Sequence, residues 1–328
     1  MIAKEIHNIL VIRPDAIGDL VLTLPAIQAV KKKFPLAKIT VLARPYTAPL
    51  LIGQPAVDAV IYDYELGKYK FDLSINYFNE FKDTFAAFKA RIPYRLGDSS
   101  RVLTGWMNNL RVFRHWEDPT RHEVEFNFDL LHPLGITDQP EKAKITIAPP
   151  SLAKAKQLLA EHGWQPNRPL AGIHLGSATS QPWSTSGFAA VIDWLAEKTD
   201  HQPILLGGPA EKDRATEVLS MIKAPVINLA GEMALPELIA LISLLNFYLG
   251  MDTGPTHIAA AFDVPQVMLL LNPNAKPARW GPWAVRHLTV AIEQRAAIPV
   301  EEVIAAVAAV LGGGGIIRST VRPQPVAS

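Results

Sequence analysis

FYLGMDTGPTHIAAAFDVPQVMLLL, residues 247–271, predicts a strand, a tight turn, a short helix and a second strand. Residues 247–249 and 266–271 are mostly apolar runs bounded by Gly and Pro, which is typical of parallel strands buried on both faces. Pro255 suits the first helical position, because its missing N–H costs nothing there, and Gly254 suits the cap before it. The stretch therefore predicts an α/β fold with a parallel sheet.

The helix start inside this stretch is a candidate anion site. We expect the backbone N–H groups of Thr256 and His257 to be unpaired, with the hydroxyls of Thr253 and Thr256 beside them. Free donors at the positive end of a helix dipole favour a phosphate or diphosphate. The alternative is that Asp252 and Thr253 only cap the helix, as in many α/β turns. These residues alone do not decide between the two interpretations.

Length and composition narrow the class of protein. A chain of 328 residues exceeds the usual size of one hydrophobic core, so we expect two domains. Hydrophobic residues make up 49% and charged residues 19%, as in globular proteins. Lys and Arg number 32 against 31 Asp and Glu, a balance that argues against a nucleic-acid partner. Cysteine is absent, which excludes disulfides, thiolate metal sites and cysteine nucleophiles.

The N-terminus and the apolar runs predict a cytoplasmic location. The start MIAKEIHNILVIRPDAIG has an apolar run too soon interrupted by Arg13 and Asp15 to be a signal peptide. No run reaches the roughly 18 to 20 apolar residues that a membrane-spanning helix needs. A contact with a membrane surface stays open.

The first half of the chain begins with a parallel crossover. Residues 9–12 predict a buried strand, residues 18–33 an amphipathic helix, and residues 39–43 the next strand. Asp19 lies in the first turn of that helix, at the carboxyl edge of the sheet, where open α/β folds bind ligands. The alternative is that Asp19 only complements the helix dipole. We assign Asp15 to capping or turn formation.

Composition also suggests where the domains meet. Residues 122–136 predict a packing helix ended by Gly135, and residues 151–162 predict another helix. WQPNRP, residues 164–169, is the predicted linker. We therefore expect a first Rossmann-like domain at 1–165, a second at 166–311, and a flexible tail at 312–328.

DTGPTHIAAAFDVP closely resembles the pattern D-T-G-P-x-H-[LI]-A-A-A-x-x-x-P of the bacterial heptosyltransferases, glycosyltransferase family 9. Two other segments are similar to the family: HEVEFNFDLLHPLGI, which we interpret as packing only, and the N-terminal segment. The N-terminal matches are Arg13, Ile17, Gly18, Asp19, Thr23, Pro25 and Ala26. The resemblance covers about residues 6–311. It implies the GT-B architecture, two doubly wound domains facing a cleft, with the last helix packing back on the first domain.

The resemblance also implies roles for residues. Asp19 would be the base that takes the proton from the acceptor hydroxyl. The diphosphate of a nucleotide sugar would lie at Asp252, Thr253, Gly254 and His257, and Thr256 is the further candidate from the helix start. Glu211 follows the family's G-G-P-x-E and would bind the ribose, although an acid at a helix start also complements the dipole.

One position departs from the family pattern. The family has Lys two residues before Trp in K-x-W-P, where its charge neutralises the leaving diphosphate; here SQPW has Gln181. Another cation would have to substitute, and the candidates are Lys276, Arg279 and Arg13. Asn274 and Ala275 also break the family's usual G-P-T-x-P. These changes leave the identity of the donor open.

The reaction implied by the resemblance is an inverting, metal-independent glycosyl transfer without a cofactor. The donor would be a nucleotide sugar, ADP-heptose by analogy, and the acceptor an anionic glycolipid of the lipopolysaccharide-core type. Residues 78–116, with interleaved basic and aromatic side chains, would face that acceptor or an anionic inner membrane; they could equally be solvated helix faces.

Other functions stay open from the sequence. The first is a paralogue with another donor, or with a protein or small-molecule acceptor, and the second is a degenerate member that only binds nucleotide. A sugar-nucleotide epimerase or hydrolase of similar doubly wound build would also bind diphosphate. An NAD-type epimerase would be expected to show G-x-G-x-x-G after its first strand, which RPDAIGD lacks.

Overall fold

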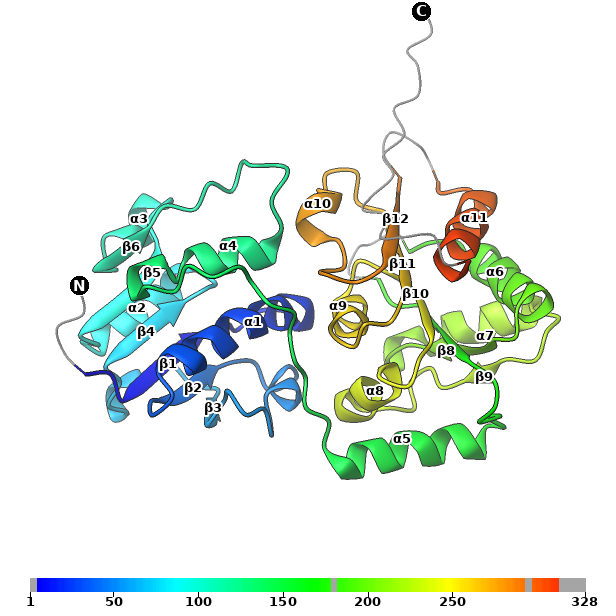
Figure 1. Cartoon of the computed structure of the whole chain (residues 1–328), viewed down its shortest axis with the longest axis horizontal. Coiled ribbons are helices and arrows are strands. Elements are labelled where there is room, and N and C mark those ends of the chain that lie inside the picture. The colour runs from blue at the N-terminus through cyan, green and yellow to red at the C-terminus, as the bar shows by residue number, and fades with distance from the viewer. Residues whose placement is uncertain (1–4, 178–181, 293–296, 313–328) are drawn as a thin grey trace, which may run out of the picture. The chain divides into compact units, whose positions relative to one another are not determined.

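The computed structural model describes residues 5–177, 182–292 and 297–312, and it divides into two compact units. The first unit is Met1–Thr146 and the second is Ile147–Ser328. Each unit contains one six-stranded sheet in which all paired strands are parallel (Figure 1). The predicted α/β class with two doubly wound parallel sheets is therefore confirmed.

The first sheet has the strand order β3-β2-β1-β4-β5-β6. Its strands are β1 (Asn8–Ile12), β2 (Lys38–Leu42), β3 (Ala59–Ile61), β4 (Leu73–Asn76), β5 (Tyr94–Asp98) and β6 (Leu110–Val112). In β1, Ile9 pairs with Ile39 on one side and with Leu73 on the other. The apolar runs that predicted buried strands are fully enclosed here, because helices cover the sheet.

The second sheet repeats this topology, with the order β12-β11-β10-β7-β8-β9. Its strands are β7 (Leu170–His174), β8 (Gln202–Leu206), β9 (Ile227–Asn228), β10 (Phe247–Met251), β11 (Gln266–Leu270) and β12 (His287–Ala291). The strand order reverses beside β1 and β4 in the first sheet and beside β7 and β10 in the second. Ligands of doubly wound folds bind at the carboxyl ends of the strands at such points.

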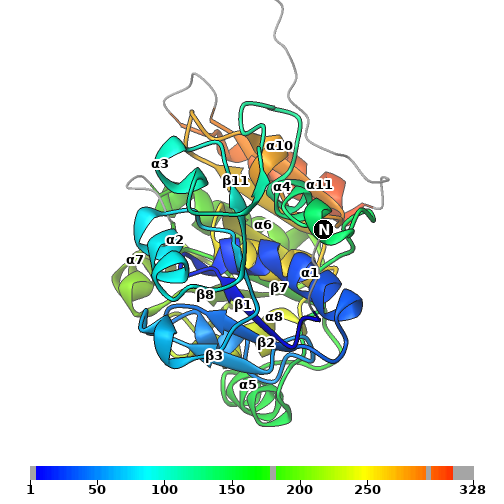
Figure 2. The ribbon, with the colours of Figure 1, turned by 90° about the vertical axis from the view of Figure 1, so that its left-hand side faces the viewer.

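Four α-helices belong to the first unit: α1 (Ile17–Lys33), α2 (Phe81–Lys89), α3 (Val102–Gly105) and α4 (Glu123–Asp129). Helix α1 packs against α4, and α2 packs against α3, β4 and β5 (Figure 2). Apolar side chains of the β-strands and α2 form a buried cluster that includes Leu10, Leu42 and Ala86.

Seven α-helices of the described chain belong to the second unit: α5 (Pro149–Glu161), α6 (Thr185–Lys198), α7 (Lys212–Met221), α8 (Leu235–Ile242), α9 (Gly254–Ala261), α10 (Pro277–Trp280) and α11 (Val300–Leu311). Phe188 from α6, Leu249 from β10 and Val307 from α11 lie in one buried cluster. The apolar face of α11 lies in the core of the second unit. The expected packing of this last helix on the first domain stays a prediction.

The division between the units falls earlier than the sequence predicted. The structure separates them after Thr146, whereas the linker was placed at residues 164–169. The reason is that α5 packs against α8 and buries Ala155 and Leu159, so this helix belongs to the second unit. The predicted tail lies outside the described residues from position 313 onward. Within the described ranges, no helix is long and apolar enough to cross a membrane.

Candidate active site

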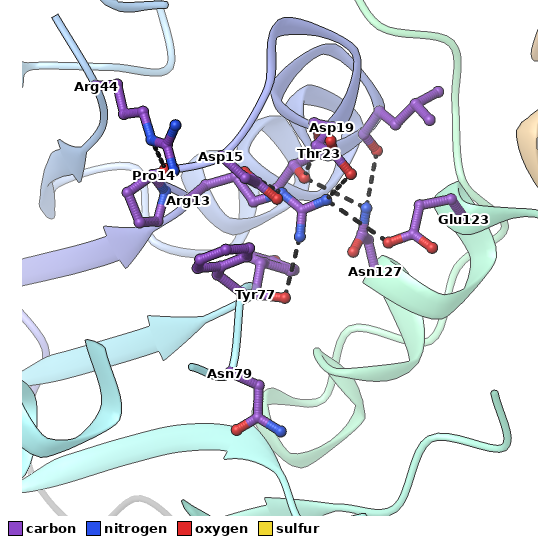
Figure 3. Close-up of polar contacts among 12 residues, drawn as sticks. Arg13, Pro14, Asp15, Asp19, Thr23, Arg44, Tyr77, Asn79, Glu123 and Asn127 are labelled. Atoms are coloured by element: carbon purple, nitrogen blue, oxygen red, sulfur yellow. Dashed lines mark hydrogen bonds and ion pairs between the residues drawn. The ribbon is translucent and has the colours of Figure 1, made fainter. Parts of the chain in front are cut away.

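A buried arginine is the centre of a polar cluster in the first unit (Figure 3). The guanidinium of Arg13 lies 2.9 Å from Asp19, from its Nη2 to Oδ1, and 3.6 Å from Glu123, from the same nitrogen to Oε1. Its Nε lies 3.2 Å from Oδ1 of Asp15, and its Nη1 donates to the carbonyl of Tyr77 at 3.0 Å. One cation therefore meets three carboxylates.

The turn between β1 and α1 brings two of these acids together. Helix α1 begins at Ile17, and its cap residue Ala16 makes no side-chain cap bond. Asp15 was expected to cap the helix or form the turn, but its carboxylate pairs with Arg13 instead. Asp19 lies in the first turn, and its backbone carbonyl accepts a 2.7 Å bond from the Thr23 hydroxyl. Its carboxylate is the most exposed of the three, at 25%.

The acids of the cluster compete for the arginine. Burial raises the pKa of Asp15 to about 7, with Arg13 opposing the rise and the charges of Asp19 and Glu123 adding to it. Asp15 therefore changes its charge near neutral pH, within contact distance of the group that holds Asp19.

Helix α4 supplies the third acid, which sequence reasoning missed. The segment 122–136 was interpreted as packing only, yet Glu123 is almost fully buried against Arg13. Asn127, one turn later, donates to the carbonyl of Leu22 at 3.2 Å and lies 3.3 Å from the Thr23 hydroxyl. These bonds fix α4 on α1. The only sequence signal for Glu123 was an acid at the start of a predicted helix, and its burial against Arg13 came from the structure.

A second buried arginine, Arg114, lies next to Arg13. Arg114 approaches Asp98 with its Nε 3.4 Å from Oδ2, and its Nη2 lies 3.4 Å from the carbonyl of Tyr77 that Arg13 also uses. Burial lowers the pKa of Arg114 to about 10, against the neighbouring Asp98 and Glu123, which favour the cation. Glu123 therefore acts on both arginines.

A pocket of about 390 Å³ opens beside the same turn of the first unit. Its lining combines aromatic rings with charges of both signs: Pro14, Ala43, Arg44, Pro45, Tyr62, Tyr64, Phe78, Glu80, Lys82 and Asp83. Arg44 is held by the carbonyl of Pro14 at 2.6 Å, and the hydroxyl of Tyr64 donates to Asp83 at 2.7 Å. Aromatic faces with carboxylate acceptors and cations are suited to an anionic sugar.

Asn79, the residue after Phe78 of this pocket, is buried without hydrogen-bond partners for its side chain among the described residues. Its side chain is labelled in Figure 3. Asn79 is 4% exposed and has a left-handed backbone, with φ of 56°. Within the described part of the chain, neither atom of its side-chain amide has a hydrogen-bond partner. Buried polar groups normally have partners, and strained residues cluster at ligand sites. Asn79 is therefore a candidate ligand contact that the sequence did not indicate.

In the second unit, the motif of residues 252–257 lies at the carboxyl end of β10. Helix α9 begins at Gly254, with Thr253 as its cap and Pro255 in the first turn, so the cap lies one residue earlier than predicted. The hydroxyl of Thr253 contacts the carbonyl of Met251 at 3.3 Å. Asp252 follows the strand directly, at the reversal point of the sheet.

Thr256 has a structural role, contrary to the prediction of a free donor. Its N–H donates to the carbonyl of Thr253 at 3.1 Å, and its hydroxyl donates to the carbonyl of Met251 at 2.6 Å. The side chain is fully buried. The first turn of α9 closes on itself and on β10, so Thr256 has no donor left for a phosphate.

Two buried histidines lie at this reversal point. His257 is 3% exposed, and its Nε2 lies 3.7 Å from Oδ1 of Asp252. Its Nδ1 is buried and has no hydrogen-bond partner among the described residues. His174 ends β7, and burial lowers its pKa to about 4, so its ring is neutral near pH 7. The sequence did not single out His174.

Glu211 forms its own local turn. Its Oε2 accepts a 2.7 Å bond from the N–H of Gly208, at the start of the 3₁₀ turn Pro209–Glu211 that leads into α7. A Cβ at Gly207 would lie 2.7 Å from the Cβ of Glu211, which explains glycine at that position. The capping interpretation therefore accounts for one carboxylate oxygen of Glu211.

Several cationic side chains are candidates to replace the family lysine. Gln181 lies outside the described residues. Arg13 is occupied by the carboxylates of the first unit. Lys276 and Arg279 belong to the segment after β11, the neighbour of β10. A further candidate is Arg214, whose Nη2 donates to the carbonyl of Trp183, two positions after Gln181.

A sequence profile of glycosyltransferase family 9 (heptosyltransferase) matches residues 63–304. The chain belongs to this family. It is 28% identical over 297 residues to lipopolysaccharide heptosyltransferase 3 of Escherichia coli, covering 81% of this chain and 84% of the relative.

Solved structures agree in fold. A family 9 glycosyl transferase from Veillonella parvula superimposes with a TM-score of 0.82 at 22% identity, covering 94% of this chain and 99% of that one. The ADP-heptose lipopolysaccharide heptosyltransferase II of Escherichia coli gives 0.78 at 21% identity, covering 93% and 98%. This family 9 glycosyltransferase therefore has the GT-B fold class that the sequence predicted.

Membership of family 9 makes the protein a glycosyltransferase. Within the described residues, no group of three or more His, Cys, Asp or Glu side chains could hold a metal ion.

Proposed function

We propose that this glycosyltransferase moves a heptose, or a related sugar, from a nucleotide diphosphate donor to a hydroxyl of a lipopolysaccharide-core-type acceptor. The observation that carries the proposal is the carboxylate of Asp19, partly exposed and held by Arg13 at the carboxyl edge of the first sheet. The names of the relatives support heptose as the sugar and ADP-heptose as the donor. Family membership supports a reaction at the cytoplasmic face of the inner membrane.

In the proposed reaction, Asp19 is the general base. It takes the proton of the acceptor hydroxyl while that oxygen attacks the anomeric carbon, and the bond from this carbon to the diphosphate oxygen breaks. The products are the glycosylated acceptor and the nucleoside diphosphate. A single displacement inverts the anomeric configuration. The exposure of the Asp19 carboxylate supports the assignment, because a base must reach its substrate while its orientation is fixed by the arginine.

We propose that the leaving diphosphate binds at the start of α9. Asp252, Thr253, Gly254 and His257 lie together there, at the reversal point of the second sheet. The dipole of α9 favours the charge that develops on the leaving oxygen. The unpartnered Nδ1 of His257 supports a ligand contact, since buried polar atoms are rarely left unsatisfied. Glu211 would accept from the ribose hydroxyls with the carboxylate oxygen that does not cap the turn.

We assign the acceptor sugar to the pocket of the first unit. Its cations Arg44 and Lys82 suit an anionic group, and Tyr62 and Phe78 offer apolar ring faces. Asn79 would hydrogen-bond a sugar hydroxyl with the amide that lacks a protein partner.

One assay tests the function. Purified enzyme is incubated with ADP-heptose, or with other nucleotide sugars in turn, and a deacylated core acceptor, and the product is analysed by mass spectrometry and NMR. We expect transfer from ADP-heptose, an inverted anomeric centre, and no loss of rate with EDTA. The departures Gln181, Asn274 and Ala275 favour a second candidate, the same transfer with another donor. Transfer from a different nucleotide sugar alone would select it, and transfer from none would refute the proposal.

A further inference from the structure

Six large apolar side chains are exposed on one segment of the first unit. They come from α2, from the segment around α3 and from the end of β6, with exposed fractions from 42% to 89%: Phe81, Phe85, Val102, Leu103, Trp106 and Phe113. We call these residues the α2–α3 face. Single exposed apolar residues are ordinary, but a group of this size on one segment indicates an interaction surface.

Ring contacts connect the two helices of this face. Phe81 and Phe85 stack at 5.5 Å between ring centroids along α2, and Phe88 of α2 meets Trp106, next to α3, edge-on at 5.2 Å. Helices α2 and α3 also contact each other through their backbones and lie side by side (Figure 2). The two helices that carry most of the face are therefore neighbours, with ring contacts along α2 and from α2 to Trp106.

The exposed charged side chains of the same segment are mostly basic. Its exposed cations are Lys82, Lys89, Arg91, Arg101 and Arg111. Of its acids, Asp83 and Asp98 are buried, and Glu80 pairs with Arg101 at 3.0 Å. Exposed apolar side chains surrounded by cations are complementary to a surface with anionic headgroups over hydrocarbon.

We propose that the α2–α3 face docks the enzyme on the surface of an anionic phospholipid bilayer. Val102 and Leu103, the two most exposed apolar side chains of the face, enter the boundary between headgroups and acyl chains, and the cations contact the phosphates.

The docking face and the pocket assigned to the acceptor have neighbouring residues in the chain. Glu80 and Lys82 line that pocket, while Phe81, between them in the chain, belongs to the face. A bilayer bound to the face would thus present the headgroup sugars of a lipid-linked acceptor beside the pocket. This link to the acceptor rests on the proposed function, whereas binding to phospholipid does not.

Vesicle flotation with the full chain tests the proposal. The vesicles contain phosphatidylethanolamine with phosphatidylglycerol, or phosphatidylcholine alone, and the bound fraction gives the affinity. We expect binding only to the vesicles with phosphatidylglycerol. Val102→Ser/Leu103→Ser should weaken it at least about 10-fold, because two apolar anchors are lost. Lys89→Gln/Arg91→Gln should weaken it and reduce its salt dependence.

The matched control is Leu36→Ser/Ile52→Ser, which removes two exposed apolar side chains of the first unit that lie outside the face. It should bind vesicles as the wild type does. Wild-type protein that ignores anionic vesicles, or a Val102/Leu103 variant that binds them normally, would overturn the proposal. A wild-type dimer that this variant dissociates, without vesicle binding, would assign the face to a second copy instead. Vesicle binding without sugar transfer would refute the proposed function and leave the docking face standing.

Discussion

Arg13 holds Asp19 at 2.9 Å, and the same nitrogen of its guanidinium also faces Glu123. Here two further acids, Asp15 and Glu123, draw on the same positive charge. The arginine thus orients Asp19 while three carboxylates share its positive charge.

Replacing the proposed base should stop the reaction without disturbing the fold. Asp19→Asn keeps the size of the side chain and removes its ability to take a proton, so transfer should fall on the order of 10²- to 10⁴-fold. The melting temperature and the affinity for ADP should stay near wild type. Asp138→Asn, at an exposed acid, is the control and should retain full activity. Near-normal turnover in Asp19→Asn would refute the assignment.

Glu123 should tune the base through Arg13. In Glu123→Gln, Arg13 loses one of three negative partners, while Asp15 and the neighbouring Arg114 remain. Asp19 then has one competitor fewer for the guanidinium, which holds its carboxylate more tightly. We therefore expect kcat to fall a few-fold.

The control for this experiment is Glu125→Gln, in the same turn of α4. Glu125 accepts from the N–H of His122 at 2.7 Å, and a glutamine oxygen can do the same. Its kcat should match the wild type. If both variants lost the same share of kcat, Glu123 would have only a packing role.

Asp15 should make the stability of the first unit depend on pH. Burial raises its pKa in the folded state from 3.8 to about 7, so the folded protein binds a proton that the unfolded chain has released. Stability from this group therefore declines as the pH rises from about 4 to about 7, by at most about 4 kcal/mol. The side chain in Asp15→Asn stays neutral at every pH. The stability of this variant relative to wild type should therefore be higher at about pH 8 than at about pH 5. Thermal melts at both pH values measure this; a constant difference would contradict it.

Arg214 is predicted to supply the charge that Gln181 lacks. Arg214→Gln should weaken ADP binding by roughly 10-fold or more, because a charge-assisted hydrogen bond is worth about 1.5 to 3 kcal/mol. Adding Gln181→Lys to that variant should restore most of the affinity. Lys276→Gln serves as the comparison in calorimetry. A loss confined to Lys276→Gln would move the assignment there, and no rescue by Gln181→Lys would show that position 181 does not face the phosphates.

The sequence alone predicted strands of both sheets, several helices and the motif positions, but not β4, β5, β6, α2 or α3. Apolar runs such as residues 9–12 and 266–271 are strands because a run this uniformly apolar is stable only when both faces are covered. Helix α1 was predicted within one residue at its start, and Asp19 was found in its first turn. These features depend on neighbours in the chain, which a sequence displays directly.

Only the tertiary structure decided which side chains meet. The carbonyl of Tyr77 lies 64 positions from Arg13, and Asn127 reaches Leu22 across 105 positions, so no local pattern could pair them. For the same reason α5, which looked like part of the first domain, belongs to the second through its contact with α8. Thr256, predicted as a free donor, is tied to Met251 because β10 ends directly beside the first turn of α9. Local chemistry names the candidates, while burial and partners from distant segments determine what each can do.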